Sequence, residues 1–159
     1  MKIIKTNGNN KDFYRICEGL DASLNENVPG RRDAGLNSLY NLESIKDVFL
    51  LYDGDKVIGS ACLFCHDDAH CEVIRVFIEN DYRGRGLVQK LFAKVERLAR
   101  KKGYDTIYLR TWASTPYSLR AYNKMGYTGI QKKEYVYADK FPKALLLSNL
   151  RIYMKKQLA

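Results

Sequence analysis

Residues 72–87 read EVIRVFIENDYRGRGL, and this stretch decides the fold of the chain. Residues 72–78 are mostly apolar and typical of a strand, and apolar residues then recur at helical spacing over residues 87–101. Between them, the Arg-Gly-Arg-Gly loop can turn tightly and let a ligand approach its backbone. The first N–H groups of a helix are unpaired and favour an anion, so we predict a pyrophosphate site at residues 83–88.

Strands and helices alternate along the chain on both sides of this stretch. Turn residues at 53–56 join two apolar segments into a predicted hairpin. The order of elements predicts a single α/β domain over residues 1–159, with a mixed, mostly antiparallel sheet flanked by helices. The expected elements are strands at 2–5, 48–52, 57–64, 72–78, 106–112, 127–136 and 150–158, and helices at 11–24, 36–42, 87–101 and 116–125.

The size and cysteine content of the chain restrict its class. A chain of 159 residues is long enough for one domain with its own core. No apolar run approaches the roughly 20 residues that cross a bilayer, and residues 1–5 do not resemble a signal peptide. Four irregularly spaced cysteines do not suit a secreted disulfide scaffold. We therefore expect a cytoplasmic protein with no membrane partner.

The charge is divided unevenly between the two halves of the chain. Residues 1–80 contain 9 Lys and Arg against 13 Asp and Glu, a net charge of −4. Residues 81–159 contain 18 against 5, a net charge of +13. A basic half suits an anionic ligand, either a nucleic acid or a phosphorylated cofactor, and an acidic half suits a cationic ligand.

A bare Gly-x-Gly loop is also typical of an ordinary strand-to-helix turn, so a second motif is needed to decide. Residues 118–127 read SLRAYNKMGY, and with residues 72–87 they resemble the two signature segments of the GNAT N-acetyltransferase superfamily. The resemblance covers essentially the whole chain and is strongest over residues 47–130. It implies splayed central strands and acetyl-CoA as the acyl-donor substrate. It also implies direct transfer of the acetyl group to a primary amine in a ternary complex.

The resemblance assigns roles to individual residues. A backbone amide of residues 76–78 would stabilise the oxyanion, and Tyr122 would protonate the departing CoA thiolate as general acid. Glu72 would be the base, directly or through water, with a solvent-facing strand residue as the alternative. Val88 and Thr115 depart from the family pattern, which has a small residue and often an Asn there. The implied cofactor-binding residues are Val76, Phe77, Ile78, Arg83, Gly84, Arg85, Gly86, Leu87, Val88, Thr115 and Ser118.

The charge division predicts a cationic primary amine as acceptor, whether a small molecule or a peptide. The early helices and their loop would form one wall of its cleft. Arg31 and Arg32 complicate this interpretation, because they could bind a carboxylate or phosphate on the acceptor. The final strand and residues 144–147 could mediate a homodimer. The acidic candidates for the acceptor wall are Glu18, Asp21, Glu26, Asp33 and Glu72.

Three alternatives compete with this interpretation. Cys62-x-x-Cys65-His66 with His70-Cys71 has the spacing of a zinc cluster, but a strand would turn Cys62 and Cys65 to opposite faces, so no metal is expected. A basic nucleic-acid-binding module could use the aromatic residues of the second half, yet no nucleic-acid motif is present and no nucleic-acid partner is expected. A catalytically silent acyl-CoA sensor of the same fold remains open, because fold alone does not establish activity.

Overall fold

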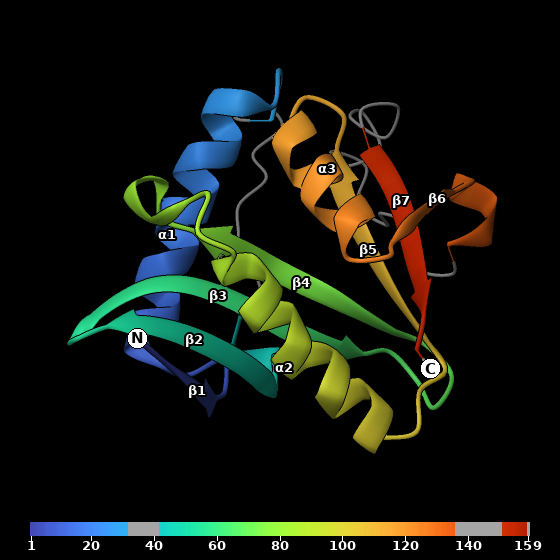
Figure 1. Ribbon diagram of the computed structural model, residues 1–159, viewed down its shortest axis with the longest axis horizontal. Coiled ribbons are helices and arrows are strands. Elements are labelled where there is room, and N and C mark those ends of the chain that lie inside the picture. Colours follow the sequence, from blue (N-terminus) through green and yellow to red (C-terminus); the bar gives the residue numbers. More distant parts are fainter. Residues whose placement is uncertain (32–41, 136–150, 159) are drawn as a thin grey trace.

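The computed structural model describes residues 1–31, 42–135 and 151–158. In this part of the chain, seven strands form one sheet in the order β1-β2-β3-β4-β5-β7-β6, and α1 and α2 cover its opposite faces (Figure 1). The strands are β1 (Lys2–Thr6), β2 (Asp47–Asp53), β3 (Lys56–Cys65), β4 (Cys71–Ile78), β5 (Thr106–Trp112), β6 (Thr128–Ile130) and β7 (Arg151–Gln157). The helices are α1 (Lys11–Asn27), α2 (Leu87–Lys101) and α3 (Pro116–Lys124), with short 3-10 turns η1 (Leu42–Ser44), η2 (Asn80–Tyr82) and η3 (Lys132–Glu134).

The two long helices form where the sequence supplies an apolar face and a defined start. Asn10 caps α1 by accepting hydrogen bonds from the backbone N–H groups of Asp12 and Phe13 at 2.8 and 3.2 Å. Phe13 then packs with the other buried residues of α1 against one face of β2 and β3. The apolar face of α2 packs against the opposite face of the sheet.

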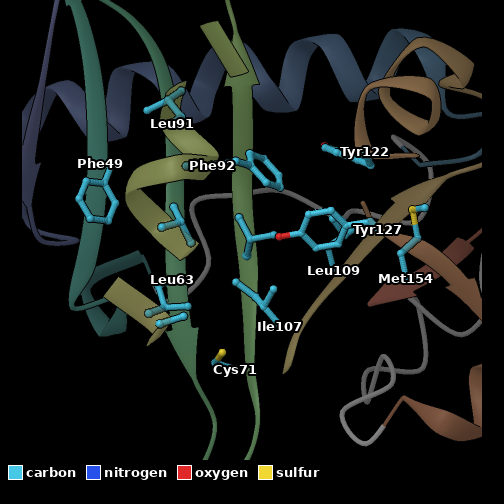
Figure 2. Close-up of a cluster of buried hydrophobic side chains, with 14 of the residues drawn as sticks. Phe49, Leu63, Cys71, Leu91, Phe92, Ile107, Leu109, Tyr122, Tyr127 and Met154 are labelled. Carbon is cyan, nitrogen blue, oxygen red and sulfur yellow. The ribbon is translucent and has the colours of Figure 1, made fainter. Parts of the chain in front are cut away.

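A core of buried side chains fills the space between α2 and the sheet. Phe92 packs against Tyr122 and Tyr127 with ring centroids 5.5 and 5.6 Å away, and Figure 2 shows the three rings within one cluster. The Tyr127 hydroxyl donates to Glu96 at 3.0 Å, and the ammonium of Lys156 binds the same side chain at 2.8 Å. This core joins α2, the end of α3 and β7 into one unit.

The central strands β4 and β5 separate soon after they meet. They are parallel and paired only at Cys71 with Ile107 and at Glu72 with Tyr108. Figure 1 shows the two strands close together at one end and far apart at the other. Beyond Glu72, the β5-facing edge of β4 therefore has no strand partner among the described residues.

A β-bulge in β4 accompanies the separation. Cys62 pairs with Ile74 and Ser60 pairs with Phe77, so Ala61 alone faces two residues of β4. One of the two is Arg75, whose φ of 54° lies in the left-handed region, where non-glycine residues are uncommon. The bulge shifts the alternation of side chains, so residues before and after it do not follow one simple pattern.

The predicted fold class is confirmed: the domain is α/β with a mostly antiparallel sheet, flanking helices and splayed central strands. The predicted strand at 127–136 is too long, because β6 ends at Ile130 and η3 turns the chain inward toward Tyr135, which is buried. Helix α1 runs three residues beyond its predicted end, to Asn27. Most of the predicted helix at 36–42 lies outside the described residues, as do residues 144–147.

We predict that Phe92→Ala lowers the free energy of unfolding by about 3–5 kcal/mol, because Phe92 is 1% exposed and its removal leaves a cavity between two tyrosine rings. Urea denaturation at pH 7 measures the change. Tyr117→Ala is the control, because Tyr117 is 42% exposed and its loss should change stability by no more than about 0.5 kcal/mol. Equal losses in the two variants would contradict this account of the core.

Candidate active site

A cavity of about 1200 Å³ opens where β4 and β5 separate. Its walls are β4, the segment from η2 to the start of α2, β5, α3 and the inner side of α1. It is therefore bounded by elements from both faces of the sheet. A cavity of this size is large enough for a ligand of cofactor size.

The glycine loop forms one side of this cavity. Gly84 and Gly86 have φ angles of 77° and 72°, a left-handed conformation that glycine adopts without strain. A Cβ at Gly84 would meet no atom within 4 Å, so conformation rather than space requires glycine there. Gly86 directly precedes α2, and no side chain there caps the first N–H groups of the helix. The loop thus presents unpaired backbone donors and a helix dipole to an anion.

The two arginines of the loop have different positions. The Arg83 Nε donates to the carbonyl of Ile78 at 2.9 Å, and its guanidinium lies 5.5 Å from the rings of both Phe77 and Tyr117. Arg83 lines the cavity. Arg85 is exposed, donates to the Asp81 carbonyl at 3.0 Å and does not line the cavity. Of the two, Arg83 is therefore the one placed to contact a ligand in the cavity as the loop stands.

Tyr122 reaches the cavity from α3, on the β5 side of the gap. Burial raises the pKa of its phenol, as does the nearby Tyr117, whereas a hydrogen bond with Ser118 acts in the opposite direction. The phenol is therefore protonated at neutral pH. A protonated hydroxyl at the cavity wall can donate a proton or a hydrogen bond to a reacting atom.

Glu72 lies at the point where β4 and β5 part, and three side chains hold its carboxylate. The His66 Nε2 is 2.8 Å from Oε1, and an Arg110 nitrogen donates to the same oxygen at 3.2 Å. The Tyr135 hydroxyl donates to Oε2. Glu72 is 3% exposed, yet it still lines the cavity. A solvent-facing strand glutamate, the alternative considered from sequence, is therefore not what the structure shows.

The surroundings of Glu72 decide its ionisation. Burial acts to raise its pKa, but the hydrogen bond with His66, the charge of Arg110 and the hydrogen bond from Tyr135 together hold that pKa below its usual value. Glu72 is therefore a carboxylate at neutral pH. A carboxylate so stabilised is a weak proton acceptor.

The structure brings nearly all the sequence-predicted site residues to one cavity. Thr115 is buried and its hydroxyl donates to the carbonyl of Trp112 at 2.9 Å, which leaves its oxygen lone pairs as the means of contacting a ligand. Arg85 is the exception already noted. The predicted residues that line the cavity are Glu72, Val76, Phe77, Ile78, Arg83, Gly84, Gly86, Leu87, Val88, Thr115, Ser118 and Tyr122.

The predicted acidic wall for a cationic acceptor is not found among the described residues. Glu18 and Glu26 are exposed and do not line the cavity. Asp21 is buried and paired with Arg31, while Glu72 is held by its three partners. Asp33 lies outside the described residues. The net charge of residues 1–80 did not predict the charge of the cavity wall, because most of the carboxylates in this half point to solvent or already have a partner.

Sequence reasoning also missed residues that shape the site. Arg110 and Tyr135 were given no role, and His66 was considered only as a zinc ligand, although all three surround Glu72. Alternation along residues 106–112 could have placed Arg110 on the face away from the α2 core. Arg75 was also recognisable from sequence as a possible site residue, because it is a charged residue inside a mostly apolar strand. Nothing in the sequence pointed to Tyr135.

The sites proposed as alternatives look different in the structure. Cys62 and Cys71 are buried, Cys65 is exposed, and the described residues contain no group of three or more side chains placed to hold a metal. Trp112, Tyr122 and Tyr127 are buried and are not available to stack on bases. Among the described helices, none has the length and apolar character needed to span a membrane.

The splayed sheet, the glycine loop and the tyrosine of α3 meet in one cavity, an arrangement expected of an acyltransferase. The model of the acetyltransferase (GNAT) family matches residues 19–127, which is more than half of the chain. The chain therefore belongs to the GNAT family.

Individual relatives agree with this assignment. The mycothiol acetyltransferase of Corynebacterium efficiens is 31% identical over 91 residues, which cover 57% of this chain but only 30% of that protein. An acetyltransferase from Streptococcus agalactiae has a TM-score of 0.77 at 20% identity, with 99% of this chain and 98% of that chain covered. N-acetylglutamate synthase from Neisseria gonorrhoeae, complexed with coenzyme A and N-acetyl-glutamate, has a TM-score of 0.72 at 15% identity, with 100% of this chain and 36% of that chain covered. The structural matches confirm the fold.

We predict that Glu72→Gln lowers the free energy of unfolding by roughly 3 kcal/mol at pH 7, because it removes the carboxylate that pairs with Arg110. This value is the lower end of the range for a broken buried ion pair, because Arg110 is partly exposed. The lowered pKa means that the carboxylate stabilises the fold above the unfolded pKa and ceases to do so as pH falls through the folded value. The difference between wild type and variant should therefore shrink in acid.

Urea unfolding at pH 7 and at successively lower pH measures both parts of this prediction. Glu134→Gln is the matched control, because Glu134 is exposed and its ion pair with Lys155 is long, at 4.0 Å. Its loss should change the free energy of unfolding by less than about 1 kcal/mol. If the difference in free energy of unfolding between wild type and Glu72→Gln stays constant as the pH falls, the charge of Glu72 is not the stabilising feature.

Proposed function

We propose that this chain is an N-acetyltransferase that moves an acetyl group from acetyl-CoA to a primary amine by direct attack in a ternary complex. The observation that carries the proposal is the cavity at the parting of β4 and β5, which has an anion-binding loop on one side and a protonated tyrosine on another. The side formed by α1 is left for a second reactant.

The relatives support the choice of donor and reaction. The mycothiol acetyltransferase is named for acetyl transfer, and the N-acetylglutamate synthase structure holds coenzyme A together with an N-acetylated amine. Membership of the GNAT family makes the same donor the expected one for this chain.

In the proposed complex, the pyrophosphate of acetyl-CoA lies on the backbone of residues 83–88, and the remainder of the donor extends into the gap between the strands. The edge of β4 beyond Glu72 has no partner on β5. An N–H group on that edge, within residues 76–78, would donate to the thioester carbonyl. Donors fixed in advance where negative charge develops lower the barrier to acyl transfer.

The amine nitrogen then attacks the carbonyl carbon, and the carbon–sulfur bond breaks. Tyr122 gives its hydroxyl proton to the departing sulfur, and it regains a proton that the nitrogen loses through solvent. The net reaction moves one proton from amine to thiol. A free alkylamine has a pKa of about 10.4, so it must be deprotonated before attack. The lowered pKa of Glu72 favours removal of that proton through water over direct abstraction by the carboxylate.

We predict that Gly84→Ala weakens CoA binding about tenfold in calorimetry at 0.15 M salt, because an alanine in the left-handed region costs about 1–2 kcal/mol and would pull the loop out of shape. Gly103→Ala is the matched control. Gly103 also has a positive φ, and a Cβ there would likewise meet no atom within 4 Å, but it follows the far end of α2, about 22 Å away. Equal CoA affinity in both variants would place the pyrophosphate elsewhere.

We predict that Tyr122→Phe keeps CoA affinity but lowers kcat by about 10²–10⁴-fold, the usual contribution of one group that transfers a proton. The ring remains packed against Phe92, so the fold should be retained. Single-turnover measurement of thiol release separates the chemical step from product release. Unchanged chemistry in Tyr122→Phe would leave Tyr122 as a packing residue.

A further inference from the structure

We propose that the amine acceptor carries a carboxylate, and that Arg75 and Arg31 bind this carboxylate on the α1 side of the cavity. The proposal rests on the proposed function and names the substrate class of the same site. It replaces the cationic acceptor expected from the charge of the two halves of the chain.

The β-bulge gives Arg75 its position. Because Ala61 faces both Arg75 and Val76, the regular alternation of β4 is interrupted at this point. The Arg75 side chain interacts electrostatically with Cys17 and Asp21 of α1 and with Arg31. It therefore points to the α1 face, away from α2, which covers the opposite face of the sheet (Figure 1). Arg75 also lines the cavity.

The charges beside Arg75 do not balance. Arg31 is buried and pairs with Asp21 at 2.8 Å, and it also donates to Asn25 at 2.6 Å. No carboxylate among the described residues pairs with Arg75, and its Nε is buried without a hydrogen-bond partner there. Among the described residues, Asp21 is the one carboxylate whose charge acts on Arg75, and it is already paired with Arg31. A buried charge without a partner is unfavourable, so this corner of the cavity favours a ligand anion.

The described residues of the cavity offer a cationic acceptor no carboxylate that is not already paired. Glu72 is the one acidic residue among the described residues that line the cavity, and it is already held by Arg110, His66 and Tyr135. The guanidinium of Arg151 lies 3.8 Å from the Trp112 ring and is a further positive group that lines the cavity. A polyamine or an aminoglycoside would meet repulsion here.

The amount of excess positive charge beside Arg75 favours a carboxylate over a phosphate. Within the part of the chain that the structure describes, Arg75, Arg31 and Asp21 sum to one positive charge, which a single carboxylate neutralises. A guanidinium also binds a carboxylate through two parallel hydrogen bonds, a geometry that the planar group supplies without rearrangement. In the proposed complex the phosphates of the donor are bound by the glycine loop, which leaves Arg75 and Arg31 to the acceptor.

The test compares amino acids with their carboxamides as acceptors for the wild-type protein and acetyl-CoA, with release of the CoA thiol as the signal. We expect kcat/KM to be about 10- to 100-fold higher for the acids, the effect of one or two charge-assisted hydrogen bonds. The amine of a carboxamide has a lower pKa than that of the acid, so more of it is present as the reactive free amine. This difference favours the carboxamides and therefore works against the expected result. Carboxamides that equal the acids, or spermidine or aminoethyl phosphate as the best acceptor, would overturn the proposal while the acetyltransferase function stands.

A matched pair of variants tests the binding group itself. Arg75→Gln should raise KM for the amino acid about 10- to 100-fold and leave KM for acetyl-CoA unchanged, because only the acceptor contacts Arg75. Arg97→Gln, on the exposed face of α2 and outside the cavity, should change neither constant. An Arg75→Gln effect of equal size on an acid and its carboxamide would overturn the proposal. If Arg75→Gln does not fold, the acid and carboxamide comparison decides alone, and no thiol release with any amine overturns both this proposal and the proposed function.

Discussion

The structure depends on the short pairing between β4 and β5. Two residue pairs hold the strands together, and beyond Glu72 and Tyr108 the strands diverge. A sheet normally satisfies its backbone groups by pairing. Here part of the β4 edge has no partner strand within the described sheet, which gives a ligand both space and backbone donors. The cavity, the approach of α3 and the access from α1 all follow from this divergence.

The charged cluster around Glu72 lies where the strands part, and it joins three segments that are distant in sequence. His66 follows β3, Arg110 belongs to β5, and Tyr135 follows η3. Buried ion pairs of this kind seldom stabilise a fold more than apolar side chains of the same volume would, but they are directional. Their directionality fixes where the strands stop pairing, since each partner must reach the same carboxylate. The cluster therefore sets the shape of the cavity, whatever it contributes to stability.

Much of the fold was predictable because local patterns agree with the tertiary structure. The glycine loop, α2 and the hairpin at 53–56 each depend on residues close in sequence. Tyr122 and the loop could be placed because their motifs are short and specific. The direction of Arg75 could not be predicted, since one extra residue in a strand changes which face a side chain occupies. The pairing of Arg31 with Asp21 was equally hidden, because a count of charges does not say which carboxylates are already neutralised. Tyr135 meets Glu72 across 63 positions of sequence, and no local pattern carries that information.

The position of β7 in the sheet also has a consequence for the order in which the domain is made. β7 lies between β5 and β6, and β6 pairs only with β7 in the described sheet. During synthesis, the meander of β1 to β4 can assemble with α1 and α2 as soon as these have left the ribosome. The segment from β5 to β6 must wait until residues 151–157 emerge, and during that interval one edge of β5 stays open to pairing with another chain. The protein is therefore most exposed to misassembly late in its synthesis, after the half that holds the glycine loop is already in place.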